Sequence, residues 1–370
     1  MKRILMGTCG LLLVLVIVFA CGSPTSVSND VDYNRYLYSH GIYGYTGKQP
    51  IFFCNNYLYS IDDNESHMLR KVCKRANCNH SDSTCSAWLD TDSIYVQNGR
   101  IYYISSDKLN HYALYHCNEH GEDRKRVCAL PFLDVSGAGF SWRLCGSIVV
   151  FDISYWSLDG ISQDILYLDL DHLNKDATIA FHSESEIVHS YVAPETNGSW
   201  IIVKSYDLLT KECSLLGYSL ATNETVTISS EWNKLNILVL LPETMNWFSP
   251  GDGFYSLDLH TMASRKLWDC KIRGFAMFDD SYIYISNANN IINYENAFGT
   301  EETQGLYIYT YEGHLQSFLP FADEVQIAGY LGSSPQKVFF MKARGSLLPS
   351  WYIDKEKIGT SSITFHEIKQ

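Results

Sequence analysis

A single pattern of apolar and polar positions recurs along most of the chain. An apolar pair that contains Tyr or Trp opens a short strand, a polar turn follows, and a second strand ends about ten residues later. Aromatic and β-branched residues fit the half-buried surface of a sheet, so each copy predicts a β-hairpin. We find seven copies, which begin at Leu58, Leu114, Leu166, Leu216, Phe254, Leu306 and Trp351.

A second kind of hairpin lies between these copies. Its mark is a short turn followed directly by a run of apolar residues. Two-residue turns such as Asn-Gly accept positive φ angles and match the twist of the strands that they join. The turns of this second kind are Asn98-Gly99, Cys145-Gly146, Asn197-Gly198, Asp279-Asp280 and Ser334-Pro335-Gln336.

The two hairpins alternate, and the pair repeats roughly every 40–55 residues. Four strands at this period predict the blade of a β-propeller. One blade cannot bury both faces of its sheet, whereas a ring of blades buries them and removes most exposed edges. Two β-sandwiches also have closely spaced strands, but they do not explain the alternation. We predict an all-β propeller over residues 36–370 with seven four-stranded blades, or else six or eight. Its first hairpin must come from Tyr36–Phe53, where the pattern is weakest.

Residues 1–20 predict a secretory signal peptide. Lys2 and Arg3 precede an apolar segment. Its length is borderline for the ~20 residues that are needed to span a bilayer. The segment ends in Val18-Phe19-Ala20-Cys21, and polar residues follow at once. This ending resembles the bacterial lipobox, in which a small residue precedes a cysteine that is lipidated and becomes the new N-terminus. Phe19 departs from the small or aliphatic residue that is usual at its place.

Lipidation of Cys21 predicts the cellular location of the protein. Stable anchoring takes at least two acyl chains, such as palmitate, and bacterial lipoproteins carry that many. Residues 21–35 are polar and are expected to form a flexible tether between the lipid and the first strand. We therefore expect a protein anchored to the extracytoplasmic face of the cell membrane. An uncleaved anchor and an ordinary secretion signal are the alternatives.

The acidic balance of the chain argues against nucleic acid as a partner. The net charge is −13, and loss of Lys2 and Arg3 with the signal makes it −15 for the mature part. No run of Lys and Arg offsets this excess. Because an acidic body repels phosphate backbones, we expect no nucleic-acid partner.

The densest group of reactive side chains lies in one short segment. Cys73, Cys78, His80 and Cys85 have the spacing Cys-x4-Cys-x-His-x4-Cys. Three thiolates and an imidazole suit a tetrahedral zinc site. Cys78 and His80 are two positions apart and would point in opposite directions along a strand, so a shared site needs a turn between them. A disulfide between two of the cysteines, which suits an oxidising exterior, and a loop of free thiols are the alternatives.

This segment falls between the last strand of the first blade and the first strand of the second. We therefore expect the three cysteines to cluster on the face formed by the blade-to-blade connections. The stretch from Lys74 to Ala87 is polar and too short to form a core of its own. A covalent or metal link is expected to order it.

The segment and the signal together resemble a known group of sequences. Uncharacterised lipoproteins of gut Firmicutes carry a similar Cys-x4-Cys-x-His-x4–6-Cys segment after a first Tyr-rich hairpin. The match covers the signal, residues 58–88 and the loose blade pattern beyond them. Ala76 and Asn77 stand where a proline often precedes the second cysteine. The resemblance implies a propeller of the broad TolB-like kind and gives no substrate.

Cys117 and Cys128 lie on either side of a predicted hairpin. Gly121 suits the left-handed position after a type I turn, which centres the hairpin near His120. Cys117 then faces about Asp123, so we predict no disulfide between the two cysteines. The other cysteines of the body are expected to be small apolar residues in strands or turns: Cys54, Cys145, Cys213 and Cys270.

Catalytic motifs are not found. The sequence has no G-x-S-x-G elbow and no H-E-x-x-H zinc motif. The carboxylate pairs fall in predicted turns, where we expect solvated side chains: Asp62-Asp63, Asp279-Asp280 and Glu301-Glu302. Four tryptophans are candidates either for a sugar-binding platform or for packing between blades: Trp142, Trp156, Trp247 and Trp351.

A binding or scaffold module is the function that these observations favour. A rigid propeller presents loops to a glycan or protein ligand, and the lipid holds it at the membrane. The alternative is an extracytoplasmic enzyme that processes glycans or peptides, since propellers host such enzymes. Fold analogy does not choose between the two. No catalytic residue is predicted, and zinc is the one candidate cofactor.

Overall fold

The computed structural model describes most of the chain beyond residue 42. The described residues are 43–61, 67–107, 109, 111–136, 138–157, 160–173, 176–184, 186–193, 200–207, 210–229, 237–240, 244–272, 274–287, 304–321, 327–342 and 348–369. The chain divides into two units, residues 1–31 and 32–370, and every described residue belongs to the second. The predicted signal peptide and tether, with the pairs Asp62-Asp63, Asn197-Gly198 and Glu301-Glu302, lie outside the described residues. Across the described ranges, no helix is long and apolar enough to cross a membrane.

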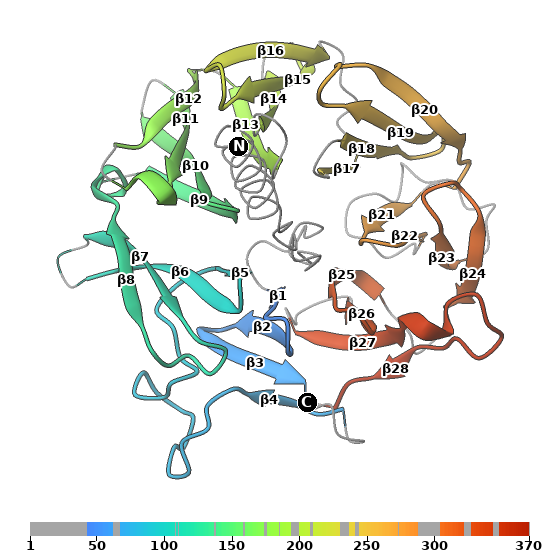
Figure 1. Cartoon of the computed structure of the whole chain (residues 1–370), viewed down its shortest axis with the longest axis horizontal. Coiled ribbons are helices and arrows are strands. Elements are labelled where there is room, and N and C mark those ends of the chain that lie inside the picture. The colour runs from blue at the N-terminus through green and yellow to red at the C-terminus, as the bar shows by residue number, and fades with distance from the viewer. Residues whose placement is uncertain are drawn as a thin grey trace, which may run out of the picture. The chain divides into compact units, whose positions relative to one another are not determined.

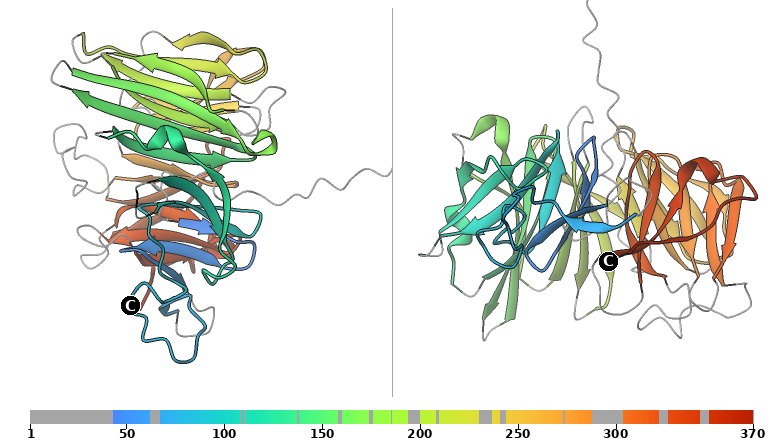
Figure 2. Two further views of the ribbon diagram at one scale, coloured as in Figure 1. Left: turned by 90° about the vertical axis from the view of Figure 1, so that its left-hand side faces the viewer. Right: turned by 90° about the horizontal axis from the view of Figure 1, so that it is seen from below.

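The second unit is a ring of seven four-stranded antiparallel sheets (Figures 1 and 2). Each sheet is built from four strands that follow one another in the chain. The first strand of each sheet lies nearest the centre of the ring and the fourth lies at the rim (Figure 1). The prediction of an all-β propeller with seven four-stranded blades is therefore confirmed.

The strand bounds of the first four blades are as follows. The first has β1 (Tyr43–Tyr45), β2 (Pro50–Cys54), β3 (Tyr57–Ile61) and β4 (Leu69–Lys71). The second has β5 (Ile94–Gln97), β6 (Arg100–Ser106), β7 (Tyr112–Cys117) and β8 (Lys125–Ala129). The third has β9 (Ala138–Cys145), β10 (Ile148–Ser157), β11 (Gly160–Asp169) and β12 (Thr178–Ser183). The fourth has β13 (Glu186–Ala193), β14 (Trp200–Asp207), β15 (Cys213–Ser219) and β16 (Glu224–Ser229).

The remaining three blades complete the ring. The fifth has β17 (Ile237–Leu240), β18 (Thr244–Ser249), β19 (Gly253–Asp258) and β20 (Ser264–Asp269). The sixth has β21 (Phe275–Phe278), β22 (Ile283–Ser286), β23 (Gly305–Tyr309) and β24 (Leu315–Pro320). The seventh has β25 (Ile327–Ser333), β26 (Lys337–Lys342), β27 (Pro349–Asp354) and β28 (His366–Glu367). Three short 3-10 helices lie in connections of the described ranges: η1 (Pro131–Leu133), η2 (Leu170–His172) and η3 (Lys355–Lys357).

The burial of each strand follows from its place in the blade. Every residue of β2 and of β22 is buried, because neighbouring blades cover both faces of the sheet at these positions. The rim strand β8 has no buried residue, and neither does β20. The core therefore consists of apolar layers between adjacent blades, such as the one that joins Ile51 and Leu58 of the first blade to Ile101 of the second.

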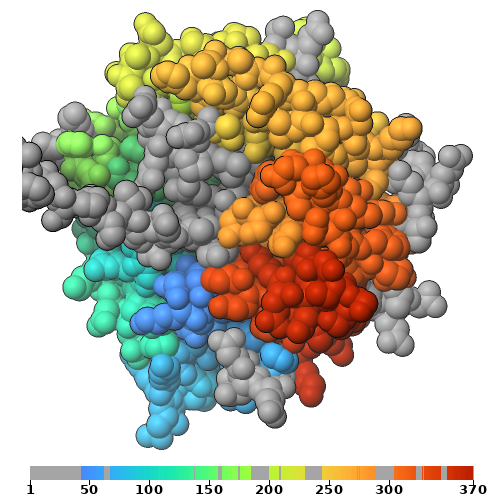
Figure 3. Space-filling view, turned by 45° about the vertical axis from the view of Figure 1, so that its right-hand side comes forward, coloured from blue at the N-terminus to red at the C-terminus, as the bar shows by residue number. Residues whose placement is uncertain are grey.

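The first blade, in blue, lies against the last blade, in red (Figure 3). Neither sheet contains a strand from the other. Tyr43 lies in an apolar layer with Phe339 of the seventh blade, and its hydroxyl donates to the Ser333 carbonyl at 2.6 Å. At the rim, Met68 pairs with Lys369 in a parallel bridge. Side-chain packing and a few hydrogen bonds therefore close the ring.

The four predicted turns of the second kind that fall among the described residues join the first and second strands of their blades. Asn98 and Gly99 have φ angles of 51° and 69°, as an Asn-Gly hairpin turn requires, and Gly146 has φ 59°. The first blade has the matching hairpin between β1 and β2, inside the predicted range Tyr36–Phe53. The pattern is weak there because β1 has only three residues.

The turn at Asp279-Asp280 corrects one expectation. The pair does lie between β21 and β22, but Asp279 is 0% exposed rather than solvated. Its carboxylate accepts hydrogen bonds from the Tyr284 hydroxyl at 2.7 Å and lies 2.8 Å from the ammonium of Lys355. The same ammonium lies 3.0 Å from Asp280. The turn is therefore held by a buried ion pair between the sixth and seventh blades.

Of the four candidate tryptophans, three pack between blades and one is exposed. Trp142 is buried in the layer between the second and third blades, and Trp247 and Trp351 pack against neighbouring layers. Trp156 alone among these four is exposed, at 60%. Three of the four are therefore blade-packing residues.

Candidate metal centre

The cysteine-rich loop is an excursion from the outer edge of the first blade. The chain leaves the edge at Val72, whose N–H donates to the Leu58 carbonyl at 3.1 Å. It returns at Ala87, whose carbonyl accepts from the Leu58 N–H at 2.8 Å. One residue of β3 thus closes both ends of the loop. The loop projects from the rim of the ring beside β3 and β4, away from the ring's centre (Figures 1 and 2).

Local turns fold the loop onto itself. The Cys78 N–H donates to the Arg75 carbonyl at 3.2 Å, and the Cys85 N–H donates to the Asp82 carbonyl at 3.1 Å. Asp82 also accepts from the N–H of Thr84 at 2.9 Å, a typical Asx turn. His80 has φ 55°, so the backbone reverses there. This is the turn that a site shared by Cys78 and His80 requires.

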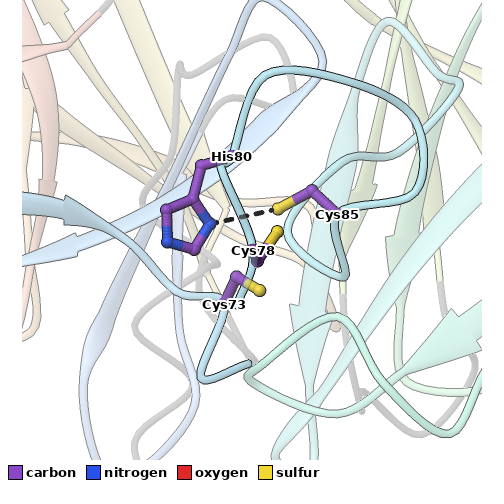
Figure 4. A group of neighbouring side chains, drawn as sticks. All are labelled: Cys73, Cys78, His80 and Cys85. Atoms are coloured by element: carbon purple, nitrogen blue, oxygen red, sulfur yellow. Dashed lines mark hydrogen bonds between the residues drawn. The ribbon is translucent and has the colours of Figure 1, made fainter. Parts of the chain in front are cut away.

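The structure brings the four side chains together (Figure 4). The ligand atoms of Cys73, Cys78, His80 and Cys85 all lie within 4.8 Å of one another. Nδ1 of His80 is 3.5 Å from Sγ of Cys85. A tetrahedron with metal–sulfur bonds of ~2.3 Å has edges of roughly 3.8 Å. The four atoms are therefore spaced almost as a tetrahedral metal site needs them, and they form a candidate metal site.

All three cysteines of the loop are free thiols in the structure. Their surroundings differ. Burial opposes ionisation of Cys73, but hydrogen bonds from the Ser86 hydroxyl, from two backbone N–H groups and from the Cys78 thiol outweigh it and lower the pKa of Cys73 to about 6. Burial and the neighbouring sulfurs raise the pKa of Cys85 to about 11. A cation between the sulfurs would reverse the second effect, because it favours the thiolate.

Ser86 completes the surroundings of Cys73. Ser86 is only 3% exposed, and among the described residues its hydroxyl meets no partner with full hydrogen-bond geometry. It still lies near enough to the Cys73 sulfur to lower the pKa of that thiol. A buried hydroxyl gains most from such an acceptor when the sulfur carries a full negative charge, as in a metal-bound thiolate.

Three cationic side chains hold the carbonyl groups of the loop. Lys71 donates to the His80 carbonyl, and its ammonium lies 3.5 Å from the centre of the Tyr57 ring. Arg75 donates to the Thr84 carbonyl at 3.0 Å. Arg124, from the turn between β7 and β8, donates to the carbonyls of Ser86 and Trp88 at 3.0 and 2.6 Å. Three thiolates with one divalent cation carry one net negative charge, which these side chains offset.

The end of the loop, from Cys85 onward, packs between the first two blades. Cys85 is 1% exposed and packs in one apolar layer with Ala87 and Leu89. Cys117 of the second blade belongs to the same layer. Gly121 of the second blade lies against the loop so closely that a Cβ on it would be 1.9 Å from the Ser86 carbonyl oxygen. The sequence spacing identified the four candidate ligands, but it carried no signal for Arg124, which approaches from another blade.

Comparisons with known proteins give the fold and nothing finer. No family model matches the chain, and no curated protein matches it. Among solved structures, an oligogalacturonate lyase in complex with manganese is 11% identical, with 88% of each chain covered and a TM-score of 0.54. Oligopeptidase B from Leishmania major is 11% identical over 76% of this chain and 42% of its own, with a TM-score of 0.51. TolB from Acinetobacter baumannii is 13% identical over 72% of this chain and 59% of its own, with a TM-score of 0.39. The chain thus shares the β-propeller fold with the oligogalacturonate lyase and with oligopeptidase B.

Proposed function

We propose that this chain is a lipid-anchored β-propeller of the extracytoplasmic membrane face, that it acts as a binding or scaffold module, and that a zinc ion orders its rim loop. The observation that carries the proposal is the set of four protein ligands, Cys73, Cys78, His80 and Cys85, gathered within 4.8 Å. Catalytic zinc sites keep one position open for water or substrate, whereas structural sites fill all four positions with protein atoms. A zinc site with four protein ligands is therefore structural: it orders the loop and has no position for a ligand. The ligand of the module would bind elsewhere on the surface of the propeller.

The donor set favours zinc over manganese. Thiolates are soft ligands that select zinc, and manganese prefers oxygen ligands. The manganese named with the oligogalacturonate lyase belongs to that protein. It gives no reason to assign manganese to three thiols and an imidazole. When bound, zinc would supply the cross-link that a polar loop without its own core requires.

Zinc content tests the proposal directly. We expect about one zinc ion per chain in protein purified without chelator, and His80→Ala should lose most of it, because three thiolates alone leave one ligand position unfilled. His314→Ala is a matched control, since His314 lies in the turn before β24, far from the loop in the chain, and is exposed. Elemental analysis of the two variants and of the wild type gives the result. Zinc at the same level in His80→Ala would remove His80 from the site.

The membrane anchor rests on Cys21, which lies outside the described residues. We expect Cys21→Ala to release the protein into the medium or to leave it as a precursor of higher mass, because the thiol is the site of lipid attachment. Cell fractionation with immunoblotting distinguishes the two. Cys54→Ala is a control, since Cys54 is buried in β2. A processed Cys21→Ala protein that still sediments with membranes would contradict lipidation.

An enzyme acting on glycans or peptides is the alternative function. Its support is the fold shared with an oligogalacturonate lyase and with oligopeptidase B, each at 11% identity. Likeness at this level does not transfer an activity. Arrays of glycans and peptides separate the two functions: a binding module retains a ligand unchanged, whereas an enzyme releases a product from it.

A further inference from the structure

The candidate zinc site lies where two blades are joined through the loop. On one side, the segment after Cys85 hydrogen-bonds to the first blade, as the Leu89 N–H donates to the Asn56 carbonyl at 2.8 Å. On the other side, Arg124 of the second blade holds the carbonyls of Ser86 and Trp88. Blades diverge towards the rim, so the segment replaces direct contact between sheets there. Whatever fixes Cys85 in place also fixes this junction.

The thiols of the site differ in their access to solvent. Cys73 and Cys78 are partly exposed, whereas Cys85 is 1% exposed. The turn that closes when the Cys78 N–H bonds to the Arg75 carbonyl folds the chain back between the two accessible cysteines. All three sulfurs lie within 4.8 Å of one another, so a small movement brings Cys73 and Cys78 to bonding distance. An oxidant from outside reaches these two sulfurs first.

We propose that the site is a peroxide-sensitive clasp between the first and second blades, in which oxidation of Cys73 and Cys78 to a disulfide expels the zinc and loosens the junction. The proposal rests on the zinc occupancy proposed above. Two thiolates give two electrons to one hydrogen peroxide, which takes up two protons and leaves as two water molecules. The sulfurs form one S–S bond, and zinc departs as the divalent ion. His80 and Cys85 remain as two ligands, too few to retain it.

The effect on the fold is local. Loss of the cross-link frees the loop from Cys73 to Cys85, and the carbonyls that Arg124 holds lose their fixed position. The turn from Asn118 to Glu122, which lies against Ser86 through Gly121, then exchanges its amide hydrogens faster. Among the residues that the structure describes, the apolar layers of the other five blades contain no residue of the loop.

The test uses the full chain in detergent, with zinc measured before and after equimolar hydrogen peroxide. We expect peroxide to release about one zinc ion per chain, detected with a colorimetric zinc dye, and to remove two thiols. A dithiol reductant with added zinc should restore both. Cys128→Ser is the matched control, because Cys128 is a partly buried thiol outside the loop, and it should respond as the wild type does.

Hydrogen exchange measures the clasp itself. Peroxide should speed exchange in the turn from Asn118 to Glu122 on the order of tenfold, while the turn of the fourth blade that contains Asn223 stays unchanged. Protein without zinc before treatment would refute the proposed zinc site. Zinc that stays bound with all thiols intact, or loss that the reductant does not reverse, would refute only the switch. Release without faster exchange at the turn would show that the site does not hold the blades together.

Discussion

Replacing Asp279 by alanine should lower the free energy of unfolding by about 3–5 kcal/mol, because it leaves a buried ammonium without its main partner. Asp279 is 0% exposed, and its carboxylate lies 2.8 Å from the Lys355 ammonium. It also accepts the hydroxyl of Tyr284 and the N–H groups of Ser281 and Tyr282, which are left without this acceptor. Urea unfolding followed by tryptophan fluorescence measures the change.

Asp280→Ala is the matched control for this experiment. Asp280 is the next residue, lies 3.0 Å from the same Lys355 ammonium, and is 20% exposed at its side chain. Partly solvated ion pairs contribute about 1 kcal/mol or less, so its removal should be mild. Equal losses in the two variants would mean that the buried position of Asp279 does not set the stability of the turn.

The blades could be predicted because their signals are local. A two-residue turn such as Asn98-Gly99 and the alternation around it lie within a dozen residues, and the φ angles of Asn98 and Gly99 agree with the turn type. The burial of Asp279 could not be predicted in this way. Its partner Lys355 lies 76 residues further along the chain in the next blade, and only the packing of the two blades brings them together.

The candidate metal centre could likewise be predicted only in its local features. The four ligands lie within 13 residues, so their spacing showed that they were able to share a site. Whether a loop lies over the ring's centre or at its rim depends on how the blades pack, and the rim position followed only from the hydrogen bonds to Leu58. Gly121 is the intermediate case. The turn predicted its left-handed conformation, which the structure has at φ 73°, but not its contact with Ser86.

That contact makes Gly121→Ala the second substitution with a large expected effect. The new Cβ would lie 1.9 Å from the Ser86 carbonyl oxygen and 2.8 Å from its carbonyl carbon. Both atoms belong to the backbone, so the loop segment after Cys85 has to move away. The φ of 73° adds the strain of a left-handed alanine, about 1–2 kcal/mol. We expect a total loss of roughly 3 kcal/mol or more in the free energy of unfolding, and faster removal of zinc by a chelator.

Gly146→Ala separates the two causes. Gly146 has φ 59° in the turn between β9 and β10, and a Cβ there would meet nothing within 4 Å. It therefore carries the backbone strain without the collision, and it lies in the third blade, away from the loop. Its loss should be limited to about 1–2 kcal/mol with zinc retention unchanged. If Gly121→Ala is no more destabilising than this control and keeps its zinc equally well, the second blade does not press on the loop, and the junction at the rim depends on Arg124 alone.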